Sequence, residues 1–369
     1  MTNPDIAHRR LLHHHIAGER FGHPDEVVTW MGAMQAQDYQ QALWAVGLRM
    51  SAPTLASVEE AIASGKIVRT WPMRGTLHFV AAENVKWMLE LLAPRRLAAD
   101  GTRLRQLELD ERILARCGQL FRDALRGGKR LSRAAMMRLL EDAQINPTGQ
   151  RGYHILWYLA QTGLICLGPI EGNEQTFVLL DEWVPVARQL SREAALAELA
   201  GCYFASHSPA TVTDFAGWAG LTLADARAGL ETAQSAAPGL VPMKHDGKDY
   251  WLVNEAQDAP DHMLHDASGV YLLPGFDEYL LGYKDRGDVL AAEHANKVVP
   301  GGNGVFYPII VVGGQVIGTW KRTFKKNAVA ITLSPFTHLA VPRERLAEAA
   351  QRVSDFVGLP LAATAVTGA

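Results

Sequence analysis

The chain has 369 residues, of which 48% are hydrophobic and 20% are charged. That is the composition of a globular protein, and the length suffices for two or three hydrophobic cores. The formal net charge of -3 excludes a protein that holds nucleic acid through overall basicity. Any DNA-binding surface must therefore gather its Arg and Lys residues locally.

The cysteines and histidines give no metal-binding pattern. Cys117, Cys166 and Cys202 are odd in number and widely separated, which fits reduced thiols and not a zinc or iron–sulfur site. Residues 13–15 are three adjacent histidines on an expected helix, where neighbours diverge and cannot share one ion. There is no apolar run of membrane-spanning length and no apolar signal core. We expect a cytoplasmic protein, nucleoid-associated when bound to DNA, with no metal and no membrane contact.

The first part of the chain reads as helices followed by a hairpin. The expected helices cover residues 8–16, 24–31, 42–48, 55–63 and 81–92, the last ending near Pro94. Residues 67–80 read as two strands around a turn and are rich in Arg, Trp and His. Three helices and a hairpin are the element order of a winged helix.

Two further cycles repeat this order. The second has helices over residues 111–125, 132–140 and 150–161, then strands over 164–167 and 177–180. The third has helices over residues 192–204, 213–219 and 223–233, then strands over 240–243 and 250–253. Asp246-Gly247 joins these last strands and is a strong hairpin turn. The repetition predicts tandem winged-helix modules over residues 1–108, 109–190 and 191–262.

The fourth predicted module, residues 263–369, changes to β structure. Strands are expected around Val270, over 305–312, over 315–322 and over 328–333, with a final amphipathic helix over 342–357. The Gly-rich loops here match no phosphate-binding spacing, and no Ser or Cys stands in a nucleophile elbow. The chain therefore offers no nucleotide cofactor site and no evident covalent nucleophile.

Two glutamines, Gln35 and Gln37, flank Ala36 between two apolar helical runs. On a helix, residues i and i+2 diverge, whereas in an extended segment they face the same way. In extended backbone both amides could therefore meet one small target. The alternative interpretation is a pair of solvent-facing amides at a helix end.

Basic residues gather on the expected modules in three clusters. They are Arg95, Arg96, Arg103 and Arg105; Arg126, Lys129, Arg130, Arg133 and Arg138; and Lys321, Arg322, Lys325 and Lys326. Such clustering suits a surface that follows DNA phosphates, although a solvated helix face is the alternative for any one cluster.

Several blocks of sequence resemble the AlkZ-like winged-helix DNA glycosylases. The blocks are Gln35-Ala36-Gln37, the run from Arg69 to His78, the run from Leu273 to Arg286, and Asn303-Gly304-Val305-Phe306 with Gly318-Thr319-Trp320-Lys321-Arg322. The resemblance implies an α+β fold of tandem winged-helix modules with a C-terminal β-barrel-like domain, forming a C-shaped DNA-binding channel. It implies excision of alkylated purines, with some members unhooking interstrand crosslinks. Ala36 departs from the larger apolar residue usual at that position.

The resemblance implies that Gln35 and Gln37 are the catalytic residues. The DNA-binding residues expected with them are Arg69, Arg74, His78, Arg130, Arg133, Arg286, Lys321 and Arg322. Arg74 and His78 are four residues apart along an expected extended run and should share one face, either contacting phosphate or joining the active site. Trp71 and Trp320 are open to core packing or DNA insertion, and Asp277 and Asp285 to ion pairing or DNA contact.

The residue types limit the chemistry. An amide does not titrate, so neither glutamine is a general base, but together they can hold a water and favour a developing oxocarbenium ion. That apparatus suits N3- or N7-alkylated purines, which carry a positive charge and leave readily. No Lys stands beside the pair to form a Schiff base, so the prediction is a monofunctional glycosylase.

We therefore expect a monomeric enzyme acting on double-stranded DNA with alkylated bases and needing no cofactor. The target base is either flipped out of the duplex or, for a bulky adduct, attacked in an open channel. The alternative is a non-enzymatic winged-helix DNA-binding protein or transcription regulator.

Overall fold

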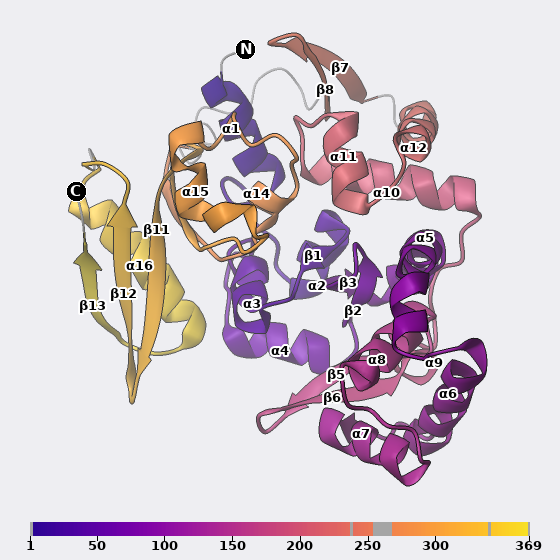
Figure 1. Cartoon of the computed structure of the whole chain (residues 1–369). Helices are drawn as coiled ribbons and strands as arrows, with labels where there is room; N and C mark the ends of the chain where they lie inside the picture. The colour runs from indigo at the N-terminus through magenta and orange to yellow at the C-terminus, as the bar shows by residue number, and fades with distance from the viewer. Residues whose placement is uncertain (1–2, 237–238, 254–267, 339–340, 368–369) are drawn as a thin grey trace. The chain divides into compact units, whose positions relative to one another are not determined.

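The computed structural model describes residues 3–236, 239–253, 268–338 and 341–367 of a mixed α+β chain (Figure 1). The chain divides into two compact units. Unit 1 joins Met1–Val58 to Leu196–Ala369, and unit 2 is Glu59–Ala195. This division is coarser than the four predicted modules, whose boundaries stay a prediction. The boundary predicted between residues 262 and 263 lies outside the described residues.

The N-terminal part of unit 1 is helical around a short extended segment. Its elements are α1 (Asn3–His13), α2 (Pro24–Met31), β1 (Met34–Gln35), α3 (Tyr39–Gly47) and the start of α4 (Leu55–Ala63). Helix α2 begins with proline at its first turn and ends at Gly32, whose φ of 72° suits glycine. Asp38 caps the start of helix α3, and its side chain accepts a hydrogen bond from the Gln41 amide at 3.2 Å.

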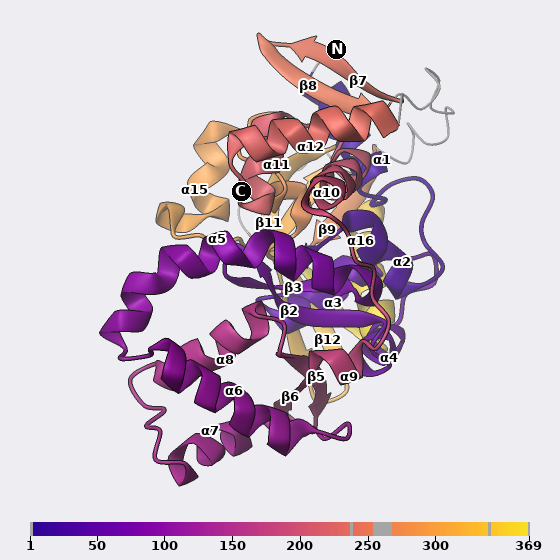
Figure 2. The same ribbon diagram turned by 90° about the vertical axis from the view of Figure 1, so that its right-hand side faces the viewer.

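The next part of unit 1 has the predicted third cycle. It consists of α10 (Arg192–Ser206), α11 (Val212–Ala219), α12 (Leu223–Ala236), β7 (Leu240–His245) and β8 (Lys248–Val253). Thr211 and Asp214 form a capping box at the start of α11, and Gly220 ends it in the left-handed region. Asp246 and Gly247 both have positive φ, so the predicted hairpin turn is confirmed. Figure 2 shows the hairpin beside α12.

The C-terminal part of unit 1 is an open sheet in the order β13-β12-β11-β10-β9. The elements are β9 (Val270–Leu273), α14 (Glu278–Leu281), α15 (Ala295–Val298), β10 (Ile309–Val312), β11 (Gln315–Lys325), β12 (Ala328–Pro335), α16 (Arg343–Val357) and β13 (Leu361–Val366). Helix α16 packs against β9, β13 and α3 and returns the chain parallel to β12 (Figure 1). Because β9 and β13 remain at opposite edges, the described strands form no closed barrel, and that expectation needs correction.

Unit 2 carries the first predicted hairpin and the second predicted cycle. Its elements are β2 (Ile67–Met73), β3 (Thr76–Ala81), α5 (Val85–Gln106), α6 (Glu111–Leu125), β4 (Leu131–Ser132), α7 (Arg133–Asp142), α8 (Arg151–Gln161), β5 (Ile165–Glu171), β6 (Glu174–Leu179) and α9 (Leu180–Trp183). The strands lie in the order β3-β2-β5-β6-β4, so the two hairpins share one sheet.

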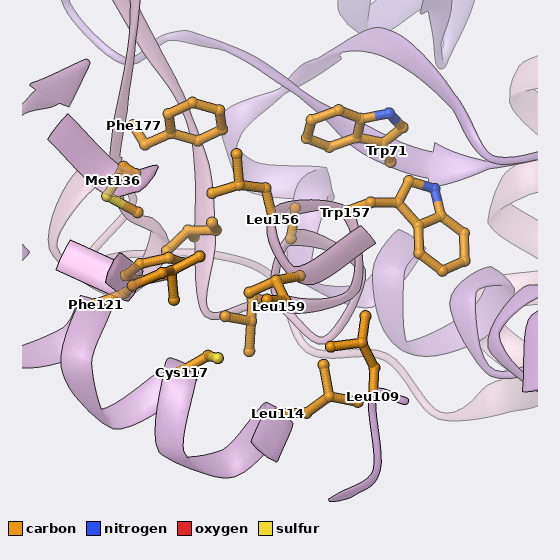
Figure 3. Packing of buried hydrophobic residues seen from close by; sticks show 14 of the residues in the cluster. Trp71, Leu109, Leu114, Cys117, Phe121, Met136, Leu156, Trp157, Leu159 and Phe177 are labelled. Carbon is orange, nitrogen blue, oxygen red and sulfur yellow. The ribbon is translucent and has the colours of Figure 1, made fainter. Parts of the chain in front are cut away.

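The core of unit 2 is an apolar cluster between α5, α6, α7, α8 and the sheet. Figure 3 shows Phe121 of α6 packed with Met136, Leu156 and Phe177, as the predicted apolar face of α6 requires. Helix α5 does not end near Pro94, as predicted, but runs through it. Proline removes one helical hydrogen bond, and the helix continues because Leu104 in its last turn is buried in this cluster.

Among the helices that the structure describes, none combines the length and the apolar character that a membrane crossing requires.

Candidate active site

The glutamine pair begins in extended backbone and ends in a bend, outside any helix. Gln35 is the last residue of β1, and Gln37 stands in the bend before α3. Ala36 between them is fully buried, whereas Gln35 is half-buried and Gln37 is exposed. The small middle residue is thus in the core, and a glutamine that is at least partly accessible flanks it on each side.

The buried side of this segment rests on a carboxylate. The Gln35 backbone N–H donates to Glu278 Oε1 at 2.8 Å. Glu278 is only 1% exposed, and its Oε2 accepts a second hydrogen bond, from Trp218 Nε1 at 3.0 Å. The side chain of Glu278 therefore joins the glutamine segment to α11.

Beside Glu278 lies an ion pair with no access to solvent. Arg49 donates from Nη1 and Nη2 to the two carboxylate oxygens of Asp277, at 3.0 and 2.9 Å. Arg49 is fully buried, and Asp277 also caps α14 through the Tyr279 amide. Asp277 therefore forms a buried ion pair, which is one of the two roles that the sequence left open for it.

Two buried histidines extend this polar network. The Arg49 guanidinium contacts His14 Nδ1 at 3.2 Å, and His14 Nε2 meets the Tyr283 hydroxyl at 3.0 Å. His207 lies next to Glu278, with 3.9 Å between Nε2 and Oε2. Burial lowers the pKa of both histidines, so both rings are neutral near pH 7. His15 instead bonds the Glu19 carbonyl, so the adjacent histidines have separate partners.

Arg322, one of the predicted DNA-binding residues, contacts the helix that follows the glutamine segment. It donates from Nη2 to the Gln40 carbonyl at 2.8 Å, in the first turn of α3. Burial lowers its pKa, while the nearby Asp38 carboxylate acts in the opposite direction. Lys321, the preceding residue on β11, is exposed.

Arg286, in unit 1, makes contacts within the fold through its side chain. Its Nε donates to the Leu280 carbonyl at 2.7 Å, and its guanidinium lies 4.9 Å from the centre of the Phe306 ring. Asp285 beside it pairs with Lys248 at 2.5 Å. These contacts favour structural roles, and DNA contact by Arg286 stays a prediction.

Arg74 and His78 meet in unit 2, but not in the predicted way. The Arg74 guanidinium lies 3.0 Å from His78 Nε2, while His78 Nδ1 bonds the Thr76 carbonyl at 2.9 Å. Arg74 has a φ of 55° and forms the hairpin turn with Gly75, so the two residues meet across the turn. The extended run that we expected between them is wrong because the chain reverses there.

The remaining predicted basic residues of unit 2 differ in exposure. Arg69 is 8% exposed and donates to Gln175 Oε1 at 3.0 Å. Arg130 is exposed and pairs with Glu171 at 3.3 Å. Arg133 is exposed at the start of α7, on the wall of a cavity of about 570 Å³. DNA binding by these residues stays a prediction, and Arg130 and Arg133 are the two exposed ones.

The two tryptophans for which core packing and DNA insertion were the alternatives are both buried. Trp71 is 5% exposed within the unit 2 cluster of Figure 3. Trp320 is 4% exposed and donates from Nε1 to the Leu273 carbonyl at 2.7 Å. Core packing therefore accounts for both side chains.

Sequence reasoning missed Glu278 as part of the site. The available signal was the Asp277-Glu278 pair in a segment of apolar and aromatic residues, where two adjacent carboxylates need buried partners. No pattern in the sequence indicates that one of those partners is the backbone of Gln35, 243 positions away.

Comparisons with known proteins bear on the family and the fold of the chain. The family profile described as DNA glycosylase AlkZ-like matches residues 28–356. The interstrand DNA cross-link repair glycosylase of Streptomyces sahachiroi is 28% identical over 319 residues, which cover 80% of this chain and 81% of that protein. The solved structure of Streptomyces sahachiroi DNA glycosylase AlkZ has a TM-score of 0.80 at 24% identity, over 100% of both chains. That structural likeness shows a common fold.

Proposed function

The chain belongs to the AlkZ-like family of DNA glycosylases, and on that premise we propose that it is a monofunctional enzyme that hydrolyses the N-glycosidic bond of cationic N3- or N7-alkylated purines. Gln35 and Gln37 are the catalytic residues of this proposal. The observation that carries it is the pair itself, with an accessible or partly accessible glutamine on each side of a buried middle residue.

The two amides suit the placement of a water molecule. Each can accept a hydrogen bond through its oxygen and donate through its nitrogen, so together they can orient a water toward the sugar. Their oxygen dipoles favour the positive charge that develops on the sugar ring as the bond breaks. Neither amide takes up a proton at physiological pH, so the leaving base must supply its own charge.

The resulting reaction needs no covalent intermediate with the protein. Water adds to the anomeric carbon as the alkylated base departs with the bonding electron pair, which neutralises its positive charge. The proton lost by the water passes to solvent. The products are the free alkylated base and an abasic site with its backbone intact.

The DNA-binding surface is the second part of the proposal. The order helix, strand, helix, helix and hairpin over α6 to β6 supports a winged-helix module, and the order of α10 to β8 supports another. Arg133, Lys321 and Arg322 are the basic residues best placed for phosphate contact by exposure or by position near the glutamines. The C-shaped channel expected from the family resemblance belongs to this proposal, as do action as a monomer and a place in the cytoplasm at the nucleoid.

The proposed substrate range extends to crosslinks. The relative from Streptomyces sahachiroi is named for the repair of interstrand DNA crosslinks. A nitrogen-mustard crosslink joins two guanines through N7, so each linked base carries the same positive charge as 7-methylguanine. One chemistry therefore serves both lesions.

Base release tests this function directly. Purified protein is incubated with duplex DNA carrying 7-methylguanine and, separately, with a nitrogen-mustard crosslink. We expect free base and intact abasic strands with wild type, and loss of at least about 100-fold in rate for Gln35→Ala or Gln37→Ala at unchanged duplex affinity. Gln40→Ala, an exposed glutamine in the first turn of α3, is the matched control and should keep the wild-type rate.

Two outcomes would contradict the proposal. Duplex binding without base release from either substrate would favour a non-enzymatic DNA-binding protein. Wild-type rates in both glutamine variants would remove the pair from the reaction.

A further inference from the structure

Glu278 is a buried carboxylate that touches the segment carrying the proposed catalytic amides. The distance from the Gln35 amide nitrogen to Glu278 Oε1 is 2.8 Å, and only 1% of the Glu278 surface is exposed. At that burial the carboxylate does not reach substrate from the accessible side. Its contact with the site passes through the backbone of Gln35.

The other oxygen of Glu278 is also held. Trp218 Nε1 donates to Oε2 at 3.0 Å, and the Trp218 indole packs against the Tyr203 ring at 5.0 Å between centroids. Tyr203 in turn donates its hydroxyl hydrogen to the carbonyl of Gly282, the residue that follows α14, at 2.7 Å. Trp218 thus holds one oxygen of the Glu278 carboxylate, and Tyr203 contacts both Trp218 and the end of the helix that carries Glu278.

His207 adds no positive charge to this arrangement. The Ser206 hydroxyl donates to the Cys202 carbonyl at 2.7 Å, so the short contact of Ser206 Oγ with His207 Nδ1 requires the ring to donate from Nδ1. In the neutral ring Nε2 then carries a lone pair, and it lies 3.9 Å from Glu278 Oε2. No hydrogen-bond partner of Nε2 is found among the described residues.

We propose that Glu278 is a positioning residue that fixes the Gln35 peptide, and through it the two amides, by accepting the Gln35 N–H while Trp218 holds its second oxygen. The inference rests on the proposed function, because it concerns the same site and the same reaction. The Gln35 N–H lies in the backbone from which the glutamine side chains project, so a fixed acceptor for it is one of the contacts that set where those side chains start. A displacement of about 1 Å in a group that orients water costs on the order of 100-fold in rate.

The geometry allows a test by loss and rescue. Glu278→Gln keeps the size of the side chain but replaces one acceptor oxygen with an NH2 donor. If the new amide oxygen accepts from the Gln35 N–H, the new NH2 group faces the Trp218 indole N–H. Two hydrogen-bond donors then face each other with no acceptor between them. Trp218→Phe removes that indole N–H, so the double variant can again present its oxygen to Gln35 without opposing another donor.

The measurement is the single-turnover rate of 7-methylguanine release, with duplex affinity and thermal midpoint measured in parallel. We expect a loss of about tenfold or more in Glu278→Gln and about two- to fivefold in Trp218→Phe, at unchanged duplex affinity. The double variant should return to within about twofold of Trp218→Phe alone. Glu348→Gln on α16, an exposed carboxylate, is the control and should match wild type.

A second cycle separates positioning from mere stability. In a Gln35→Ala background, Glu278→Gln should cause a smaller loss than in wild type, because one of the two amides that it positions is gone. A loss as large in that background as in wild type, a wild-type rate in Glu278→Gln, or no recovery in the double variant would overturn the inference.

The outcomes separate this inference from the proposed function. Should Glu278→Gln fail to fold, the double variant compared with Trp218→Phe carries the test, and a rate tenfold lower in the double variant overturns it. Absence of base release by wild type overturns the proposed function and the inference with it. An active wild type with an unaffected Glu278→Gln overturns the inference alone.

Discussion

The interior beneath the glutamine pair in unit 1 is made of polar and charged side chains, whereas the core of unit 2 is apolar. Beneath Gln35 lie Glu278, the Arg49–Asp277 ion pair and the neutral rings of His14 and His207. The unit 2 cluster in Figure 3 consists of apolar and aromatic side chains. Apolar packing is tolerant of the direction of each contact, whereas hydrogen bonds and ion pairs fix it. The polar interior therefore suits a region that must hold one segment in one place.

The largest expected effect breaks the ion pair beneath the site. Asp277→Ala leaves the Arg49 charge buried without its carboxylate, and this should lower the free energy of unfolding by about 3–5 kcal/mol. Urea unfolding measures it. Asp285→Ala, which removes an exposed pairing with Lys248, is the control and should cost less than about 1 kcal/mol. Equal losses in the two variants would contradict the account of the polar interior.

A loss of similar size, but of different origin, is expected in the unit 2 core. Phe121 is fully buried, and Phe121→Ala leaves a cavity that should cost about 3–5 kcal/mol. The cause is lost packing, so this loss should not change between pH 7 and pH 5. Ile170→Ala, at a side chain that is 38% exposed, should cost less than about 1 kcal/mol in the same urea experiment. A strongly pH-dependent loss in Phe121→Ala would contradict the assignment of this loss to apolar packing.

The buried histidines of unit 1 should also respond to acid. Burial lowers the pKa of His13 to about 4, and burial lowers the pKa of His14 and His207 in the same direction. Below about pH 6.5 the unfolded chain binds protons that these folded rings do not, so stability is present above that pH and falls toward pH 4. His13 alone should contribute on the order of 3 kcal/mol to this fall.

Unfolding free energies at pH 7, 5.5 and 4.5 check this prediction. His13→Gln should show a shallower decline with falling pH than wild type. An identical pH dependence in variant and wild type would exclude His13 as a contributor.

The smallest expected effect concerns the turn of the unit 2 hairpin. Arg74→Ala removes the contact with His78 Nε2, which should cost about 1 kcal/mol of stability and weaken duplex binding less than tenfold. The single-turnover excision rate should stay at the wild-type value, because Arg74 acts outside the reacting groups in this account. A loss of excision at unchanged affinity would place the hairpin in the active site and remove the contrast with the glutamine segment.

The sequence predicted regular elements better than it predicted contacts. Apolar periodicity located α6 correctly, and Asp246-Gly247 located the hairpin of β7 and β8, because both signals are local. Pro94 did not end α5, since packing of later residues outweighed one lost hydrogen bond. The β-barrel-like domain was expected from the family resemblance, but the described sheet is open between β9 and β13, and no local signal in the sequence encodes whether two distant edge strands meet.

The site was predictable in part for the same reason. Gln35 and Gln37 stand two positions apart, so the pair itself is a local signal. Glu278 reaches the segment only through the fold, since its hydrogen bond with Gln35 spans 243 positions and the bond that Trp218 donates to it spans 60. Arg74 and His78 meet across a turn that the sequence pattern had not placed between them.

The central claim is that two non-titrating amides suffice because the lesion supplies the positive charge. Its most direct test compares single-turnover base release from two duplexes that are identical except for the target, one carrying 7-methylguanine and the other the neutral base hypoxanthine. The account predicts release of 7-methylguanine at least about 100-fold faster than release of hypoxanthine. Comparable rates for the two bases would contradict it, because a neutral base would need an acid that the glutamine pair does not provide.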